Sequence, residues 1–357
     1  MTAAARPPGL VLHLPRSGAD GRTASVTRVG PTDLVRVGIG RPAVDAPALA
    51  ALLFPVCPAA QAGAAAIAVE RAMGLAPTPA VTAARNAVIL AEAVVGCIWR
   101  MALDWPTLVT LDPDTAIVRS ARAAQSALPQ ALFGDGRPAH WARPGGRPII
   151  QRCGADVRLA LTALSDAVRT LTSAGPPRAP MFANGNNLPQ LPRPLGTDIG
   201  TAALMPHVAP REETPRSLWA CSASPSLTLN LWFEAQAEHA DRCMDALDLA
   251  VAEALSDADQ PPQPEPNPTG VGLGVVTTAR GRLRHAITVQ DGAITGWTAA
   301  APTDWNFAAQ GPVVQMANRL LVGNDRSPAD QEAAARWLVA AFDPCAPCRV
   351  TIGPSHA

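Results

Sequence analysis

The chain has 357 residues, of which 48% are hydrophobic and 16% are charged. This is enough apolar material for a substantial core, in one large domain or in two closely packed ones. The 29 Lys and Arg residues balance the 29 Asp and Glu residues, so no basic field exists to hold nucleic acid or an anionic membrane. Small molecules or proteins are therefore the expected partners, with no nucleic acid and no membrane.

Neither a membrane span nor a signal peptide is predicted. The longest apolar stretch, 42–69, is interrupted by three prolines and carries Asp45 and Gln61. The segment 1–14 has Arg6 followed by two prolines and no continuous apolar core of signal-peptide length. Seven cysteines, an odd number spread over a long chain, fit a reducing compartment in which some thiols are free. We expect a cytoplasmic protein.

Short strands open the chain and helical periodicity follows. Strands are predicted over 9–13 and 23–29, with a possible third over 34–37. Apolar residues at helical spacing predict helices over 59–73, 81–102, 155–172, 234–255 and 328–342. Gly74 is placed to end the first of these helices. The second is apolar enough to cross the core and should end at Asp104, Trp105 and Pro106.

Two proline-rich stretches, 175–216 and 257–270, predict long connections rather than regular structure. Between the second stretch and the last helix, 283–289 and 293–297 alternate as strands around a turn at Asp291 and Gly292. The chain has no internal repeat, Walker motif or dinucleotide fingerprint.

The end of the chain carries a Cys-x-x-Cys motif, Cys345 and Cys348. Two thiols at this spacing can face one metal, and the adjacent Pro344 and Pro347 prevent a regular helix from continuing. The motif alone is only moderately specific, because zinc knuckles, disulfide exchangers and iron–sulfur sites all use it. No second such motif is present for a four-thiolate zinc site, and no thioredoxin-like pattern surrounds this one. Its partners must come from far away in the sequence.

Several segments in order resemble the large subunit of nickel–iron hydrogenases. In the C-terminal half these are 280–285, 291–294, 302–306 and 343–348, and in the N-terminal half 56–61, 68–74, 85–86 and 102–105. The resemblance implies an α+β fold, with long central helices and small peripheral β-sheets. It also implies a single hydrogenase-large-subunit-like domain over 1–357, with 175–216 and 257–270 as proline-rich connections.

The departures from the family point away from catalysis. In an active large subunit four thiolates hold nickel and iron; the resemblance makes Cys57 and Cys348 metal-bridging positions and Cys345 a nickel-only position. The fourth thiolate position is Phe54. The histidine after the last motif, where many hydrogenase precursors are cleaved, is Thr351. The chain looks neither catalytically complete nor processed.

This pattern is similar to hydrogenase accessory proteins of the HupK/HoxV type. The resemblance implies a non-catalytic scaffold, not an enzyme, that transiently holds the Fe(CN)2CO unit, with nickel unlikely. Arg280 and Thr303 match family residues that donate to the cyanides, and Asp343 matches a pocket residue. Taken alone, Arg280 would be a surface arginine, Thr303 a turn residue and Asp343 a helix cap. The implied partners are a maturation chaperone with its iron–sulfur partner, both carrying the iron fragment, and the hydrogenase large subunit.

Two alternatives remain open: an active or sensory hydrogenase large subunit, and a metal-free docking decoy for the maturation proteins. The scaffold hypothesis predicts that Cys57 and Cys348 sulfurs lie within about 4 Å of each other. It also predicts that Arg280, Thr303 and Phe54 face the same cavity. His285 is interpreted as structural and Glu92 as a candidate to replace a pocket aspartate. The remaining cysteines are interpreted as buried small hydrophobes: Cys97, Cys153, Cys221 and Cys243.

Overall fold

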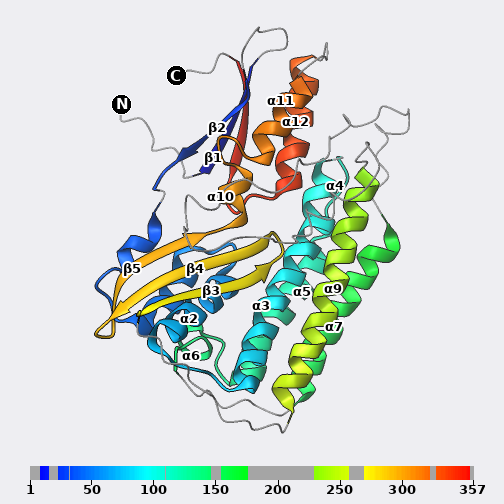
Figure 1. Cartoon of the computed structure of the whole chain (residues 1–357). Helices are drawn as coiled ribbons and strands as arrows, with labels where there is room; N and C mark the ends of the chain where they lie inside the picture. Colours follow the sequence, from blue (N-terminus) through cyan, green and yellow to red (C-terminus); the bar gives the residue numbers. More distant parts are fainter. Residues whose placement is uncertain are drawn as a thin grey trace, which may run out of the picture. The chain divides into compact units, whose positions relative to one another are not determined.

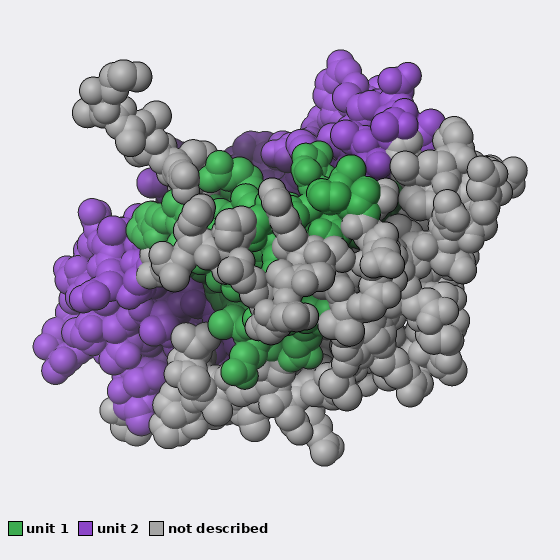
Figure 2. All heavy atoms as spheres, turned by 90° about the horizontal axis from the view of Figure 1, so that it is seen from above, with its two compact units in different colours: residues 1–32, 178–232, 301–357 green, residues 33–177, 233–300 purple. Residues whose placement is uncertain are grey.

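The structure is a computed structural model that describes residues 9–15, 23–31, 33–108, 110–145, 154–175, 229–256, 269–321 and 327–353. Two compact units divide the chain (Figure 2). Unit 1 combines 1–32, 178–232 and 301–357, and unit 2 combines 33–177 and 233–300. Unit 1 therefore joins the two ends of the sequence, whereas unit 2 is built from its middle. Each unit is described by itself.

In unit 2, helix α2 packs against a three-stranded sheet (Figure 1). The predicted helix over 59–73 is confirmed: α2 spans Pro58–Met73, and Gly74 ends it at φ 65° in the left-handed region. Two glycines of strand β3 lie directly against α2. A Cβ at Gly272 or Gly274 would come within 1.8 Å of a backbone oxygen of α2. Only glycine allows this close approach of strand and helix.

The sheet of unit 2 is antiparallel, in the order β3-β4-β5. Its strands are β3 (Val271–Thr278), β4 (Gly281–Gln290) and β5 (Ala293–Ala300). The predicted β4–β5 hairpin is confirmed, and Asp291 and Gly292 take positive φ angles of 50° and 77° at its turn. Before α2 come the short helices η1 (Leu34–Gly38), η2 (Ala43–Asp45) and α1 (Ala46–Leu53). The possible strand over 34–37 was wrong, because these residues form the 3-10 helix η1.

A helical rod follows α2. It consists of α3 (Pro79–Trp99), a π-helical turn (Arg100–Asp104) and α4 (Trp105–Leu108). The predicted helix is confirmed, but its end at Asp104, Trp105 and Pro106 was wrong. The wide π turn interrupts the ordinary hydrogen-bond ladder just before Pro106, so the missing N–H of this proline is tolerated at the second residue of α4. The whole rod, Pro79–Leu108, is long and apolar enough to cross a membrane, but 72% of its most apolar window is buried in the protein. Core helices of soluble proteins share these properties.

Further helices belong to unit 2. They are α5 (Thr115–Phe133), the short α6 (Pro138–Trp141), α7 (Gly154–Ala174) and α9 (Leu229–Leu255). Helices α3, α5 and α7 pack against one another (Figure 1). The predicted helices over 155–172 and 234–255 are confirmed as α7 and α9, whereas α5 was not predicted.

Unit 1 joins the chain ends through a sheet in the order β2-β1-β6. Strands β1 (Gly9–Leu14) and β2 (Ser25–Val29) are antiparallel, and β6 (Cys348–Ile352) pairs in parallel with β1 (Figure 1). Three helices precede β6: α10 (Pro302–Asn306), α11 (Pro312–Leu321) and α12 (Pro328–Phe342). The predicted strands β1 and β2 and helix α12 are confirmed. The α+β fold class is confirmed as well, while residues 176–216 and 257–268 of the proline-rich connections lie outside the described residues.

Candidate functional site

Cys57 lies at the first turn of α2. Helix α1 ends at Leu53, and a tight turn brings the Cys57 N–H to the Phe54 carbonyl at 3.4 Å. Pro58 then begins α2 with Cys57 as its N-cap residue. A proline at the first helical position has the required φ and needs no N–H partner. This turn places a cysteine that is 8% exposed at the positive end of the helix dipole.

The sulfur of Cys57 is the end of a buried hydrogen-bond chain in unit 2. The Gln61 Nε2 lies 3.6 Å from the Cys57 Sγ, and the Gln61 Oε1 lies 2.7 Å from the His285 Nε2. On the other side of the imidazole, the Trp297 Nε1–H donates to the His285 Nδ1 at 2.9 Å. His285 is completely buried, and desolvation lowers its pKa to about 3, so the ring is neutral. The interpretation of His285 as structural agrees with these contacts, but the link to Cys57 was not predicted.

Glu92 of α3 binds the start of α2. Its Oε2 accepts the Ala59 N–H at 2.8 Å and its Oε1 accepts the Ala60 N–H at 3.0 Å. Burial raises the Glu92 pKa to about 7. These two N–H groups and the charges of Arg280 and Arg122 oppose that rise. Glu92 therefore adds a carboxyl group close to Cys57.

Arg280 lies in the turn between β3 and β4. Its N–H donates to the Thr278 Oγ1 at 3.1 Å, and its guanidinium is near enough to Glu92 to lower the pKa of that carboxyl. Unit 2 thus brings together Cys57, Glu92 and Arg280 at one end of α2. That Arg280, Thr303 and Phe54 face one cavity stays a prediction, because Thr303 belongs to unit 1.

Phe54, which the resemblance places at the fourth thiolate position, packs inside unit 2. Its ring meets His285 edge-on, with centroids 6.4 Å apart and planes at 80°. It also packs against the apolar cluster that includes Ala50, Val69 and Trp297. An aromatic ring anchored in this way cannot provide a metal ligand.

The C-terminal motif lies in unit 1 between α12 and β6. Asp343 follows α12 at φ 45°, in the left-handed region, and its N–H donates to the Val339 carbonyl at 3.0 Å. The Thr303 Oγ1, on a residue only 2% exposed, accepts the Cys345 N–H at 3.0 Å. Unit 1 therefore brings Thr303 and Asp343 next to the motif. The Thr303 hydroxyl orients the backbone of the cysteine turn.

Cys348 begins β6. The Leu10 N–H donates to the Pro347 carbonyl at 2.8 Å, which fixes the entry into the strand. Cys345 and Cys348 are both half-buried free thiols. Burial raises the Cys348 pKa to about 11, although a contact with the Leu12 backbone opposes this rise. A metal that binds Cys348 must therefore displace a proton.

The convergence of Cys57 with Cys345 and Cys348 stays a prediction, because the first belongs to unit 2 and the others to unit 1. Within the described part of the chain, no group of three His, Cys, Asp or Glu residues is arranged to hold a metal ion. Of the remaining cysteines, Cys97 and Cys243 are buried as predicted, and Cys153 and Cys221 lie outside the described residues.

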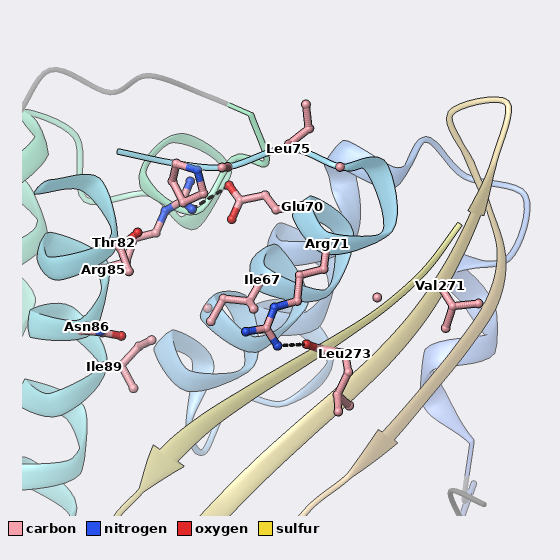
Figure 3. A pocket seen from close by; sticks show the side chains of 15 residues that line it. Ile67, Glu70, Arg71, Leu75, Thr82, Arg85, Asn86, Ile89, Val271 and Leu273 are labelled. Carbon is pink, nitrogen blue, oxygen red and sulfur yellow. Dashed lines mark hydrogen bonds and ion pairs between the residues drawn. The ribbon is translucent and has the colours of Figure 1, made fainter. Parts of the chain in front are cut away.

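A cavity of about 570 Å³ lies elsewhere in unit 2, between α2, α3 and β3 (Figure 3). Beside it Glu70 and Arg85 form a buried ion pair at 2.8 Å. The other Arg85 donors bind the carbonyls of Trp141 and Arg143, at 2.9 and 2.8 Å. In the wall of the cavity, the Arg71 guanidinium donates to the Leu273 carbonyl at 2.7 Å. This polar network connects α2 and α3 to the loop after α6 and to β3.

Comparison with known proteins identifies the family. A family model described as nickel-dependent hydrogenase matches residues 219–351. The hydrogenase expression/formation protein HupK of Azotobacter vinelandii is 30% identical over 325 residues, which are 89% of this chain and 90% of the relative. The chain belongs to the HupK-type hydrogenase expression/formation proteins of the nickel–iron hydrogenase large-subunit family. The hydrogenase expression/formation protein HupV of Azotobacter chroococcum mcd 1 is also 30% identical and covers 89% of this chain and 91% of the relative.

Solved structures of hydrogenases share the fold of this HupK-type chain. The Ni-Fe-Se hydrogenase of D. vulgaris Hildenborough in the reduced state has a TM-score of 0.61 at 16% identity, covering 90% of this chain and 93% of the other. An NAD+-reducing [NiFe]-hydrogenase in the H2-reduced state gives 0.60 at 17% identity, covering 91% and 92%. The resemblance to the large-subunit family is thus confirmed in sequence and in fold.

Proposed function

We propose that this protein is a non-catalytic accessory protein of nickel–iron hydrogenase maturation that holds the Fe(CN)2CO unit as cargo, through Cys57 and Cys348, and passes it on. The observation that carries this proposal is the contrast between the two ligand positions of the first motif. Cys57 is buried with its sulfur in a hydrogen bond, whereas Phe54 is packed in the apolar core. The position needed for iron is kept and a position needed only for nickel is filled.

The chemistry of the cargo suits the residues on each unit. Low-spin ferrous iron with cyanide and carbon monoxide ligands favours soft thiolate donors, which Cys57 and Cys348 supply. A guanidinium donates charge-assisted hydrogen bonds to an anionic acceptor, and Arg280 is assigned this role toward one cyanide nitrogen. Thr303 and Asp343 stand beside the cysteine turn in unit 1 and are assigned to the other side of the cargo.

The family supplies the expected partners. The relatives are named hydrogenase expression/formation proteins, which supports an accessory role in hydrogenase maturation. We assign as donor a maturation chaperone with an iron–sulfur partner, and as recipient the hydrogenase large subunit. Transfer between such proteins would take place in the cytoplasm, which we assign as the location of this chain.

Infrared spectroscopy tests the proposal on protein purified without oxygen from its own host. The expected result is a set of cyanide and carbon monoxide stretching bands that disappears in Cys57→Ala, with iron but no stoichiometric nickel by metal analysis. Protein that lacks these bands when freshly isolated would instead be the metal-free decoy. Hydrogen oxidation after pairing with a hydrogenase small subunit would restore the enzyme alternative.

Arg280→Leu tests the donor role separately. A charge-assisted hydrogen bond in a dry pocket is worth roughly 1.5–3 kcal/mol, so the variant should retain the iron unit about 10- to 150-fold less tightly. Arg282→Leu, two residues along the same hairpin, is the matched control and should retain it normally. Equal retention in both variants would make Arg280 a structural residue only.

A further inference from the structure

Three polar side chains from three different elements of unit 2 form a series of hydrogen bonds that ends at the Cys57 sulfur. Gln61 lies one turn along α2, His285 comes from β4 and Trp297 from β5. His285 is completely buried, while Gln61 is 3% and Trp297 is 4% exposed. A group of buried polar side chains in an apolar layer is costly unless each hydrogen bond is made. Each hydrogen must therefore lie where it can form a hydrogen bond.

The direction of the hydrogen-bond chain follows from Trp297. An indole N–H only donates, so the His285 Nδ1 at 2.9 Å must be an acceptor without a hydrogen. The neutral imidazole then carries its hydrogen on Nε2 and donates it to the Gln61 Oε1 at 2.7 Å. With its oxygen committed to His285, Gln61 must turn its NH2 group toward the Cys57 Sγ at 3.6 Å. Every donor in the chain points the same way, from the sheet to the sulfur.

We propose that Gln61, His285 and Trp297 are positioning residues that form a one-way hydrogen-bond chain, which fixes the Cys57 side chain and presents its sulfur as an acceptor. A donated N–H withdraws electron density from the sulfur that accepts it. Within this hydrogen-bond chain, Gln61 is the residue that contacts the sulfur. His285 and Trp297 set the orientation of the amide.

The proposal deepens the function proposed above and rests on it for one of its two measurements. With the iron unit bound, loss of the Gln61 donor leaves a more electron-rich sulfur, which pushes more density from iron into the carbon monoxide ligand. Gln61→Glu keeps an acceptor for His285 but offers the sulfur no N–H. We expect its carbon monoxide band to move to lower wavenumber than in the wild type, with Gln61→Leu giving the same shift or loss of the band.

Two further variants separate positioning from simple packing. Gln61→His again offers a ring N–H at this site and should bring the band back toward its wild-type position. His239→Leu is the matched control, because the His239 ring nitrogens lie 3.8 and 3.9 Å from the Sγ of Cys243, another buried thiol, across one turn of α9. Its band should stay where it is. Unchanged bands in Gln61→Glu and Gln61→Leu would overturn the proposal.

The second measurement does not need the iron unit. Protein labelled with 15N in its six histidines should show, for His285, an unprotonated Nδ1 and a protonated, slowly exchanging Nε2. Trp297→Phe should release this single tautomer into a mixture. A wild-type His285 that carries its hydrogen on Nδ1 would overturn the proposal by itself. If wild-type protein has no infrared bands, the proposed function fails, and the ring nitrogens alone decide the fate of the hydrogen-bond chain.

Discussion

The predicted ligand residues of the two units are held in different ways. On unit 2, the sulfur of Cys57 is fixed by side chains, through Gln61 and the buried residues behind it. On unit 1, Cys345 and Cys348 are fixed by the path of the backbone, between the end of α12 and the start of β6. Cys57 is buried and prearranged, whereas Cys345 and Cys348 lie in a half-buried turn.

Under the proposed function the protein must release its cargo, and this difference would then have a consequence. The cysteine turn depends on a few hydrogen bonds, such as the one from the Cys345 N–H to the Thr303 Oγ1. Cys348 depends on the pairing of β6, which among the described strands bonds to β1 alone. Such elements open at a lower free-energy cost than a buried core. Under the proposed function, Cys57 would hold the cargo and the cysteine turn would serve its entry and exit.

The largest expected effect comes from the cysteines themselves. Cys57→Ala and Cys348→Ala should each abolish the infrared bands of the iron unit, because each removes one of two bridging-type thiolates. Cys345→Ala should keep the bands at reduced intensity, since its position serves nickel in the family. Infrared spectra of protein purified without oxygen measure all three variants under one condition.

Cys97→Ala is the control for this series, because Cys97 is a buried free cysteine that belongs to α3 and to neither cysteine motif. It should keep the bands and lose about 1 kcal/mol of stability through packing. Equal loss of bands and of bound nickel in all three ligand-position variants would contradict an iron-only site and favour a complete bimetallic one.

The next effect concerns the stability of unit 2. Arg85→Met leaves Glu70 charged and unpaired among residues that are less than 5% exposed, which should cost roughly 3–5 kcal/mol of unfolding free energy. Adding Glu70→Leu should recover part of that loss. Denaturant titrations of both variants measure the difference. Arg169→Met breaks an exposed pair on α7 and should change stability by less than about 0.5 kcal/mol; a similar cost in Arg85→Met would show that the buried pair is not structural.

Glu92 gives the fold a pH dependence of known sign. Its folded pKa of about 7 exceeds the ordinary value of 4.5, so the folded state binds more protons between these limits. The Glu92 contribution therefore falls as pH rises from 4.5 to about 7 and is level above that, with a total change of up to about 3 kcal/mol. Glu92→Gln should lose this slope, measured as wild type minus variant at each pH. Subtraction cancels the opposite slope from His285, whose lowered pKa favours the folded state as pH rises toward 6.5.

Parallel wild-type and Glu92→Gln stability curves across this window would show that the carboxyl does not titrate with folding. The amide introduced by Glu92→Gln retains only one acceptor for the two N–H groups at the start of α2, which adds a cost that does not vary with pH. The slope, and not the absolute stability, is thus the measurement that decides.

The sequence predicted those elements whose ends carry residues with a strong backbone preference. Gly74 and the turn at Asp291 and Gly292 have the left-handed backbone that glycine and aspartate favour, so the ends of α2 and β4 could be predicted. Helix α5 was missed because alanine is common throughout the chain and Pro129 interrupts its pattern. Strand β3 was missed because the glycines that let it approach α2 are poor strand formers.

The candidate site was predictable only in part, for the same reason. Family resemblance located Cys57, Arg280 and the C-terminal motif one residue at a time. It did not predict that Gln61 would contact His285, because 224 positions separate them and only the packing of β4 on α2 brings them together. Long-range polar pairs of this kind leave no periodic signal in a single sequence.

The smallest expected effect lies in unit 1. Arg28 of β2 pairs with the Asp304 Oδ1 at 2.8 Å, but their side chains are 37% and 30% exposed. Water and salt screen such a pair, so Arg28→Ala should lower the unfolding free energy by less than about 1 kcal/mol. Asp304→Ala should cost more, since the Asp304 Oδ2 also accepts the Ala301 N–H at 2.7 Å at the start of α10.

Denaturation in low and high salt separates the two effects. The loss in Arg28→Ala should shrink with salt, and the excess loss in Asp304→Ala should persist. An Arg28→Ala cost comparable to that of Arg85→Met would mean that unit 1 depends on its ion pair as strongly as unit 2 does, and the contrast between the two halves would fail.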